Sequence, residues 1–467
     1  MTTLTQPLLA QFAVWLRATD SHAARHLALL DEVDLALSSL DKTSLDERRG
    51  LSRKLEKWRY QHFNQRGAEL TSQDEYLIDA LDLAANELTG REPRPPRHTR
   101  QAIHDIALET DSIKEAVALL HSSALTENHA RRAAELTHCN CVARERAARS
   151  AVPPRRRMVL YAPLYVSSEC VNDCTYCGFR FSLAITRKHL TTSQAVKQAR
   201  ILRSKGFRHL LIVAGDFPSR TTTTYYQQLI REVVKLGITP AVEIAPQGIE
   251  SYSELQRAGI CGVTLYQETY DENLYAKYHV RGPKSSFHWR LEGLDRAAEA
   301  GVARLGLGVL LGLADPREDV RRLMRHAAYL SRRFPGRTLA FSLPRIHEAP
   351  EGFRPAHSVS DDQLVRLYCA LRIAFPRAEL VLSTREAAAL RDRLARICIT
   401  QMSAGSSTTP GGYQHDDQCA DEQFPVSDNR GPREVAAWLR DQGFTVAWNV
   451  TPGAERGAKS GTHRSCM

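Results

Sequence analysis

Long apolar runs are missing from this sequence. No stretch of about twenty consecutive apolar residues occurs in the 467-residue chain, so we expect no helix that spans a bilayer. The apolar segment at residues 7–16 lacks a basic head and a small-residue cleavage site, and we interpret it as an amphipathic helix rather than a secretory signal. We therefore expect a cytoplasmic protein with no membrane contact.

Cysteine is also sparse. Ten cysteines are spread over a long chain with no secretory segment, which argues against a disulfide framework. The sequence has no internal repeat and no low-complexity tract, and its hydrophobic share of 43% is ordinary for a globular protein. A chain of this length can form one large barrel with an appended domain.

Nucleic-acid signatures are absent although the chain is basic. It has 63 basic and 53 acidic residues, a net charge of +10, with basic clusters at residues 153–157 and 321–325. No aromatic residues alternate with these clusters and no known nucleic-acid module occurs, so we predict no nucleic-acid partner. Solvated helix faces explain the clusters more simply. A basic surface could also attract an acidic electron-donor protein.

Three cysteines, in contrast, gather in one short loop. Cys170, Cys174 and Cys177 have the spacing Cys-x3-Cys-x2-Cys. Such a loop can ligate three irons of a four-iron cubane cluster and leave the fourth iron open for chemistry. Tyr176 and Phe179 would surround this cluster with apolar surface.

A structural zinc site is the main alternative for this loop. Zinc usually needs a fourth thiolate or imidazole in a second pair of ligands. The nearest candidates, His138, Cys139 and Cys141, lie far upstream beyond a proline-arginine break. We therefore favour the iron–sulfur cluster.

The chain changes character after its first third. Residues 1–92 are charged, leucine-rich and helically periodic, and they end in a proline-rich linker at residues 90–97. A second helical block, residues 101–150, stops at Pro153-Pro154. From residue 158, short apolar runs alternate with longer helical stretches, which is typical of parallel strand–helix units. We count eight such runs, at residues 158–166, 209–216, 239–246, 262–269, 304–313, 338–345, 379–386 and 398–405.

Eight strands alternating with helices predict an α/β fold, a (β/α)8 TIM-type barrel over residues 158–406 with a helical N-terminal extension. Residues 407–467 are expected to close on the barrel. Active sites of such barrels lie at the carboxyl ends of the strands. Polar residues follow most of the runs and should converge there, namely Tyr165, Gly215, Asp216, Glu268, Arg345, Ser383, Arg385 and Ser403.

The cysteine loop after the first strand resembles that of the radical S-adenosylmethionine (SAM) superfamily, and several further motifs resemble its aromatic amino-acid lyases. The similarity covers about residues 101–450 and leaves out the first hundred. The motifs are Ala162-Pro163-Leu164-Tyr165, Gln267-Glu268-Thr269-Tyr270, Gly282-Pro283-Lys284, Trp289-Arg290-Leu291, residues 306–313, Ser383-Thr384-Arg385-Glu386, residues 402–406, residues 410–413 and Gln423-Phe424.

This resemblance implies one 4Fe-4S cluster, held by the three cysteines, and SAM bound to its open iron. Electron transfer to SAM would give a 5′-deoxyadenosyl radical that takes a hydrogen atom from the substrate amine. In the lyases the Cα–Cβ bond of L-tyrosine then breaks, and p-cresol and 2-iminoacetate (dehydroglycine) form. The resemblance also implies a flavodoxin- or ferredoxin-type electron donor.

Two branches of the family are similar to this chain: the tyrosine lyases of thiamine thiazole synthesis and those of FeFe-hydrogenase maturation. The second branch carries C-terminal cysteines for an auxiliary cluster, whereas here residues 447–453 contain none and Cys466 alone follows. We therefore expect the thiamine branch, with a thiazole synthase subunit as a partner that residues 1–92 could dock. Hydrogenase maturation, tryptophan as substrate and, more distantly, a noncatalytic iron–sulfur or zinc protein remain alternatives.

The resemblance and the strand ends together suggest roles for the site residues. Asp216, after Gly215, would face the SAM amine through a bridging water, because the superfamily usually has Gly-Gly-Glu there. Glu268 and Arg290 would hold the SAM carboxylate and ribose beside Tyr176, although a structural salt bridge is an alternative for Arg290.

On the substrate side, Arg385 would grip the tyrosine carboxylate, because a planar guanidinium forms two parallel hydrogen bonds to a carboxylate. Ser403 and Ser383 could add donors, and Tyr165 could contact the substrate or move a proton. Arg345 is assigned to SAM or to the substrate without a choice between them.

Overall fold

The fold is that of a computed structural model. The structure describes residues 24–66, 83–90, 99–106, 108, 110–122, 127–147, 155–414 and 420–450, residues 80–81, and a few positions between 6 and 17. Most of the predicted helix at residues 7–16, the linker at residues 91–97, Pro153-Pro154 and Cys466 lie outside the described residues.

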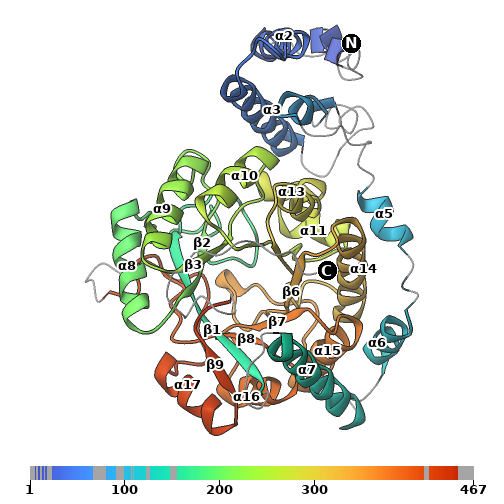
Figure 1. Cartoon of the computed structure of the whole chain (residues 1–467), viewed down its shortest axis with the longest axis vertical. Helices are drawn as coiled ribbons and strands as arrows, with labels where there is room; N and C mark the ends of the chain where they lie inside the picture. The colour runs from blue at the N-terminus through green and yellow to red at the C-terminus, as the bar shows by residue number, and fades with distance from the viewer. Residues whose placement is uncertain are drawn as a thin grey trace.

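Eight parallel strands form a closed barrel, as the apolar runs predicted (Figure 1). Neighbouring strands pair in sequence order, and β1 closes the ring by pairing with both β2 and β8. The strands are β1 (Arg157–Ser167), β2 (His209–Ala214), β3 (Thr239–Glu243), β4 (Gly262–Thr264), β5 (Arg304–Gly308), β6 (Thr338–Ser342), β7 (Glu379–Leu382) and β8 (Gln401–Ser403).

The helices that follow the strands surround the barrel (Figure 1). Local signals fix their ends: α14 begins after Asp315, whose side chain accepts from the backbone N–H groups of Arg317 and Glu318, with Pro316 at its first position. The surrounding helices are α8 (Thr192–Ser204), α9 (Thr223–Lys235), α10 (Ile249–Ala258), α11 (Glu272–Tyr278), α12 (Phe287–Leu291), α13 (Gly293–Glu299), α14 (Pro316–Arg333), α15 (Asp361–Ala374), α16 (Ala388–Ile397) and α17 (Pro432–Asp441).

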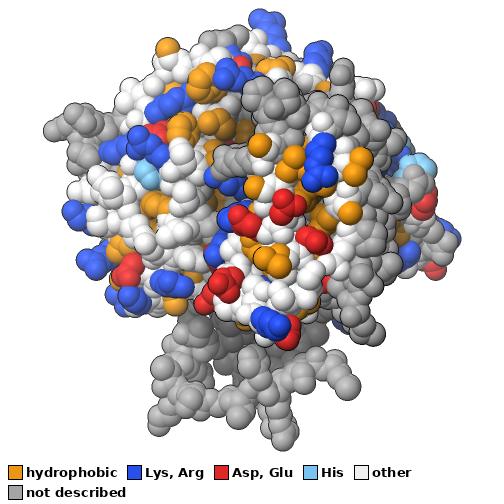
Figure 2. Space-filling view, turned by 90° about the horizontal axis from the view of Figure 1, so that it is seen from above, with side chains coloured by type: hydrophobic (Ala, Val, Ile, Leu, Met, Phe, Trp, Pro, Cys, Tyr) orange, Lys and Arg blue, Asp and Glu red, His pale blue; other side chains and the backbone are white. Residues whose placement is uncertain are grey.

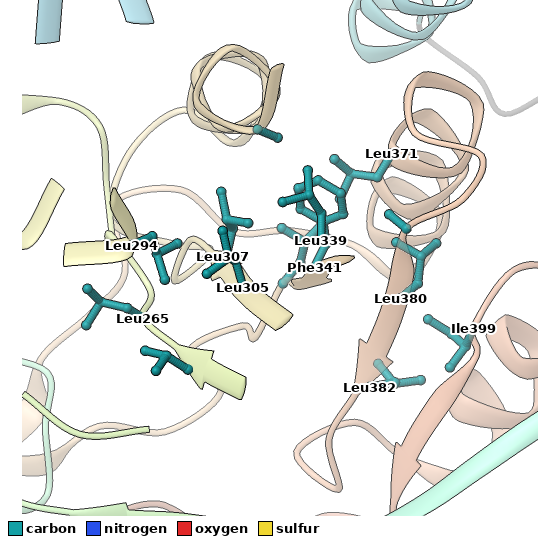
Figure 3. Close-up of a cluster of buried hydrophobic side chains, with 14 of the residues drawn as sticks. Leu265, Leu294, Leu305, Leu307, Leu339, Phe341, Leu371, Leu380, Leu382 and Ile399 are labelled. Carbon is teal, nitrogen blue, oxygen red and sulfur yellow. The ribbon is translucent and has the colours of Figure 1, made fainter. Parts of the chain in front are cut away.

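The main core lies between the strands and these helices. Alternate strand residues point outward, so Leu305 and Leu307 of β5 and Leu339 and Phe341 of β6 pack toward the helices, as Figure 3 shows. Leu371 of α15 packs among them from the helical layer. Burial on both faces explains why each strand reads as a nearly continuous apolar run.

Most strands end before the apolar runs do. The run at residues 262–269, for example, is paired as β4 only to Thr264, and the following residues continue as a loop. A ninth strand, β9 (Thr445–Ala447), pairs with residues 157–159 of β1 and was not predicted. It is three residues long and only partly buried, so it has no apolar run.

The amino end of the barrel is filled by polar side chains. Arg304 donates to the Glu379 carboxylate (Nε–Oε2 2.7 Å) and to the Gln401 amide oxygen (2.9 Å). His209 lies beside them, fully buried, and its Nδ1–H donates to the Thr239 carbonyl (2.8 Å). Burial lowers the pKa of His209 to about 4, so this ring is neutral.

Helices from the first third of the chain cover two parts of the barrel. In the described residues, α2 (Ala24–Ser38) and α3 (Leu45–Arg66) share a small core of their own, and α3 lies against α10 (Figure 1). Farther along, α5 (Thr99–Asp105), α6 (Asp111–His121) and α7 (Glu127–Ala147) follow, and α6 and α7 pack on α15.

The surface is mixed in charge. On the face in Figure 2, lysine and arginine side chains lie both at the edge and near the middle, beside acidic side chains, rather than in one basic patch. Within the part of the chain that the structure describes, no helix combines the length and apolarity needed to cross a membrane.

Candidate active site

A pocket opens at the carboxyl ends of the strands. The cysteine loop forms one wall, and the segments after β2, β3, β4, β5, β6, β7 and β8 form the others. Of the residues predicted for the site, the pocket is lined by Cys170, Cys174, Cys177, Tyr176, Gly215, Asp216, Glu268, Arg290 and Arg385.

The three cysteine thiols face this pocket together. Amide N–H groups point at two of the sulfurs: Asn172 Nδ2 lies 3.7 Å from Cys170 Sγ, and the backbone N of Phe179 and the side chain of Gln423 lie 3.4 and 3.5 Å from Cys177 Sγ. Such donors are typical of the surroundings of iron–sulfur ligands.

The donor set fits a cubane cluster better than a single ion. Among the described residues, no three His, Cys, Asp or Glu side chains come close enough together to hold one metal ion. A cubane places each thiolate on a different iron, so the sulfurs need only surround a common space. Burial raises the pKa of Cys170 to about 11, and iron binding would provide the charge that stabilises its thiolate.

Asn172 connects the cysteine loop to two other walls. Its amide nitrogen donates to Asp216 Oδ2 (3.0 Å), and its amide oxygen accepts from the backbone N–H of Lys284 (2.8 Å). The backbone of Gly215 passes so close to the Glu169 carbonyl that a Cβ atom would overlap it. A glycine is therefore required where the end of β2 meets the loop.

Glu268 is held between two cations. Its carboxylate accepts from Lys284 Nζ (2.6 Å) and from Arg290 (3.4 Å), and Arg290 also donates to the Tyr266 carbonyl (2.6 Å). Burial would raise the pKa of Glu268, but Lys284 and Arg290 outweigh it and hold this pKa below its usual value. Glu268 is thus ionised and paired.

Beside the cysteine loop, the site combines aromatic rings with a guanidinium. Arg385 lies over the ring of Phe424, 3.2 Å from the ring centroid. The Tyr165 hydroxyl donates to Gln423 Oε1 (2.8 Å), and its ring meets Phe179 edge-on. Burial raises the pKa of Tyr165 well above its ordinary value, so its hydroxyl is protonated.

Four predicted residues lie outside the pocket lining: Tyr165, described above, and Arg345, Ser403 and Ser383. Arg345 is bound by Glu386, by Asp361 (2.9 Å) and by the Val359 carbonyl (2.7 Å). Ser403 Oγ accepts from the backbone N–H of Thr384 (3.0 Å), which precedes Arg385. Ser383 Oγ lies 3.5 Å from the backbone N of Arg385. In this structure, both serines support the Arg385 segment instead of facing the cavity.

Several lining residues were missed by the sequence analysis, among them Asn172, Glu243, Tyr266, Lys284, Gln423 and Phe424. Lys284 and the Gln423-Phe424 pair occur in the motifs that carry the resemblance, but no role was derived for them. Glu243 lies inside its apolar run, whereas polar residues were sought at the ends of the runs. Burial, with the neighbouring charge of Glu268, raises the pKa of Glu243 to about 7.

Comparison with known proteins now adds to this geometry. Residues 164–327 match the family model of the Radical SAM superfamily, and residues 342–445 match that of the Biotin and Thiamin Synthesis associated domain. Over 289 residues, the chain is 39% identical to 2-iminoacetate synthase of Escherichia coli (strain K12). The aligned region covers 62% of this chain and 76% of that protein. The chain belongs to the radical SAM superfamily. Its resemblance to the 2-iminoacetate synthase family, predicted from the motifs, is confirmed.

Solved radical SAM structures show the same architecture. The FeFe-hydrogenase maturase HydG from Carboxydothermus hydrogenoformans is 28% identical, with a TM-score of 0.65, and the similarity covers 89% of this chain and 87% of that one. Methylornithine synthase (PylB), at 19% identity and a TM-score of 0.56, shares the fold over 75% of this chain and 97% of that one. Radical SAM membership implies an enzyme that uses a 4Fe-4S cluster and SAM.

Proposed function

We propose that this protein is a radical SAM tyrosine lyase, which cleaves the Cα–Cβ bond of L-tyrosine to p-cresol and 2-iminoacetate for thiamine thiazole synthesis. The observation that carries the proposal is the 39% identity to 2-iminoacetate synthase over 289 residues, combined with a pocket that three cysteines line at the mouth of the barrel.

Cys170, Cys174 and Cys177 would hold the cluster, and the polar residues beside them would bind SAM. When bound, the reduced cluster and SAM supply the 5′-deoxyadenosyl radical. Asp216 and Gly215 would receive the SAM amine, and Glu268, fixed by Lys284 and Arg290, would hold the ribose or the carboxylate side with Tyr176 nearby.

Arg385 would bind the substrate carboxylate, because its guanidinium faces the pocket and retains its hydrogen-bond donors. Tyr165 and Phe424 would contact the aromatic ring. Ser403 and Ser383 would act by positioning the Arg385 segment, and Arg345 by anchoring Glu386, one residue farther along. A closely fitted pocket suits radical chemistry because it keeps water away and leaves the radical facing only its intended target.

Anaerobic reconstitution tests the function directly. Reduced wild-type protein with SAM and L-tyrosine should yield 5′-deoxyadenosine and p-cresol, identified by mass spectrometry. Cys174→Ala should abolish both products because it removes a cluster ligand, whereas Cys139→Ala, an exposed cysteine on α7, should keep them. Release of a methylindole carboxylate from L-tryptophan, but no p-cresol from tyrosine, would favour the tryptophan alternative. Absence of 5′-deoxyadenosine would favour a noncatalytic protein.

Hydrogenase-cofactor maturation is the alternative that the HydG similarity supports. Against it, residues 447–453, where the auxiliary-cluster cysteines of that branch were sought, carry no cysteine in the sequence. A second cluster would appear as additional iron, so a count of about four irons per reconstituted chain is expected for the thiamine-type lyase.

We also propose that the protein takes electrons from a flavodoxin- or ferredoxin-type donor and that residues 1–92 dock a thiazole synthase subunit. The second statement predicts that a pull-down with the full chain retains the thiazole synthase subunit and that a chain lacking residues 1–92 loses it. The shortened chain must still form 5′-deoxyadenosine, which controls for folding. Equal retention by both chains would contradict the docking role.

A further inference from the structure

Two ionisable groups, one acidic and one basic, face the pocket without a protein partner among the described residues. Glu243 ends β3 and lines the pocket, but its carboxylate forms no hydrogen bond or ion pair with the described residues. The guanidinium of Arg385 stacks on Phe424 and likewise forms none within the described part of the chain. Glu243 and Arg385 are also not paired with each other.

The other charges of the pocket are accounted for. Glu268 is bound by Lys284 and Arg290, and Asp216 accepts from Asn172 beside the cysteine loop. Glu348 lies exposed at the rim, where water solvates it. Glu243 and Arg385 are therefore the charges, among the described lining residues, that a bound molecule would have to satisfy.

Burying an ionised group without a partner is costly, and natural proteins pair such groups. A ligand group that binds the Glu243 carboxylate must be a cation or a hydrogen-bond donor. A ligand group that binds the Arg385 guanidinium as a counter-ion must be an anion. A free α-amino acid carries both, an ammonium and a carboxylate on one carbon. It could bridge the two side chains, which line the same pocket and form no ion pair with each other.

We propose that Glu243 is the counter-ion of the substrate α-ammonium group and that Glu243 and Arg385 together select a free α-amino-acid zwitterion. This inference rests on the proposed function and deepens it, because it names the substrate class as amino acids with both α-groups unmodified. The side chains of Tyr161, Tyr165 and Tyr266 and the charges of Glu268, Lys284, Arg290 and Arg385 surround Glu243 and keep this part of the pocket polar.

The test compares ligands that lack one group at a time. Binding of L-tyrosine, tyramine, 3-(4-hydroxyphenyl)propanoate and L-phenylalanine is measured by anaerobic calorimetry on the full reconstituted chain with SAM and an unreduced cluster, so that no turnover occurs. Glu243→Gln should weaken tyrosine, tyramine and phenylalanine by about tenfold or more, because an amide cannot balance an ammonium. The propanoate, which has no ammonium, should bind both proteins equally.

Matched variants separate a charge contact from a general effect. Glu348→Gln likewise removes a carboxylate charge, but at the exposed rim. It should change tyrosine affinity by less than about twofold, because charges solvated by water contribute little to binding. Glu243→Asp keeps the charge and should retain the preference for tyrosine over the propanoate. It also provides the comparison if the glutamine variant does not fold.

Distinct outcomes overturn the inference. Equal weakening of all four ligands, or a loss of SAM affinity, would show that Glu243 supports the fold or SAM instead. Weakening of tyrosine without weakening of phenylalanine would show that Glu243 binds the phenol hydroxyl. If wild-type protein binds none of these amino acids and binds no tryptophan either, the proposed function fails together with the inference. If it binds them and Glu243→Gln does so equally, the inference alone fails.

Discussion

Among single residues, Asp319 shows how a buried carboxyl outside the pocket fixes a group inside it. Glu268 has a φ of 71°, in the left-handed region that costs a non-glycine residue about 1 kcal/mol. The residues after it are anchored to Asp319 Oδ1, which accepts from Thr269 Oγ1 (3.0 Å) and from the backbone N–H of Tyr270 (2.9 Å). The anchor offsets the strain and keeps Glu268 facing Lys284.

Asp319 also makes stability depend on pH. Burial raises its pKa to about 7, so between about pH 4 and pH 7 the folded protein binds a proton that the unfolded chain releases. Stability contributed by this group therefore falls as pH rises through that window. Asp319→Asn keeps an acceptor oxygen but cannot ionise, so the stability lost between pH 5.5 and pH 8 should shrink by about 2 kcal/mol, measured as a few degrees of melting temperature.

Glu318, the preceding residue on α14, is the control for this measurement. Its bonds to Arg321 lower its pKa, so its contribution to stability is lost only as pH falls below the ordinary range of a glutamate. Glu318→Gln should therefore leave the difference between pH 5.5 and pH 8 unchanged. An unchanged difference in Asp319→Asn as well would contradict the assigned role of Asp319.

At the scale of secondary-structure elements, a side chain from one helix of the N-terminal extension caps a helix of the barrel. The N-cap of α10 is Gly248, which has no side chain to cap the helix. Glu56 of α3 takes this role, because its Oε1 accepts from the backbone N–H of Glu250 (2.9 Å). Arg49 and Arg53 of α3 add ion pairs with Glu250 and Glu254.

Gly248 is matched to Glu56, because a Cβ atom at residue 248 would overlap the Glu56 carboxylate. Gly248→Ala and Glu56→Ala should each destabilise the contact by about 1 kcal/mol, the usual weight of a helix cap. The double variant should be no worse than Glu56→Ala alone, since the overlap is then removed. Hydrogen exchange of the first-turn amides of α10 measures this effect.

Gly50→Ala serves as the control for the glycine substitution, because Gly50 lies on the same helix α3 with open space around it. It should leave the exchange of the α10 amides unchanged. Additive effects of Gly248→Ala and Glu56→Ala would show that the two residues do not oppose each other.

At the scale of the whole molecule, the barrel could be predicted because its strands are buried on both faces and read as apolar runs. The run ends also predicted where Asp216, Glu268 and Arg385 would meet, since parallel strands bring their carboxyl ends to one side. Other features could not be predicted, because they depend on contacts between segments that are distant in the sequence or on an element too short to show a pattern. Arg345 is held by Glu386, Lys284 reaches Glu268 from a different loop, and β9 is too short to leave a pattern.

The polar closure at Arg304, Glu379 and Gln401 has a consequence for the sequence of events in catalysis. Because these side chains fill that end of the barrel, reactants and products have to pass through the opening of the pocket at the carboxyl ends of the strands. A ligand that binds deeper in the pocket must therefore enter before a ligand that binds nearer the opening. It can leave only after that ligand has left. We therefore expect ordered binding and release for any two ligands that bind at different depths in the pocket.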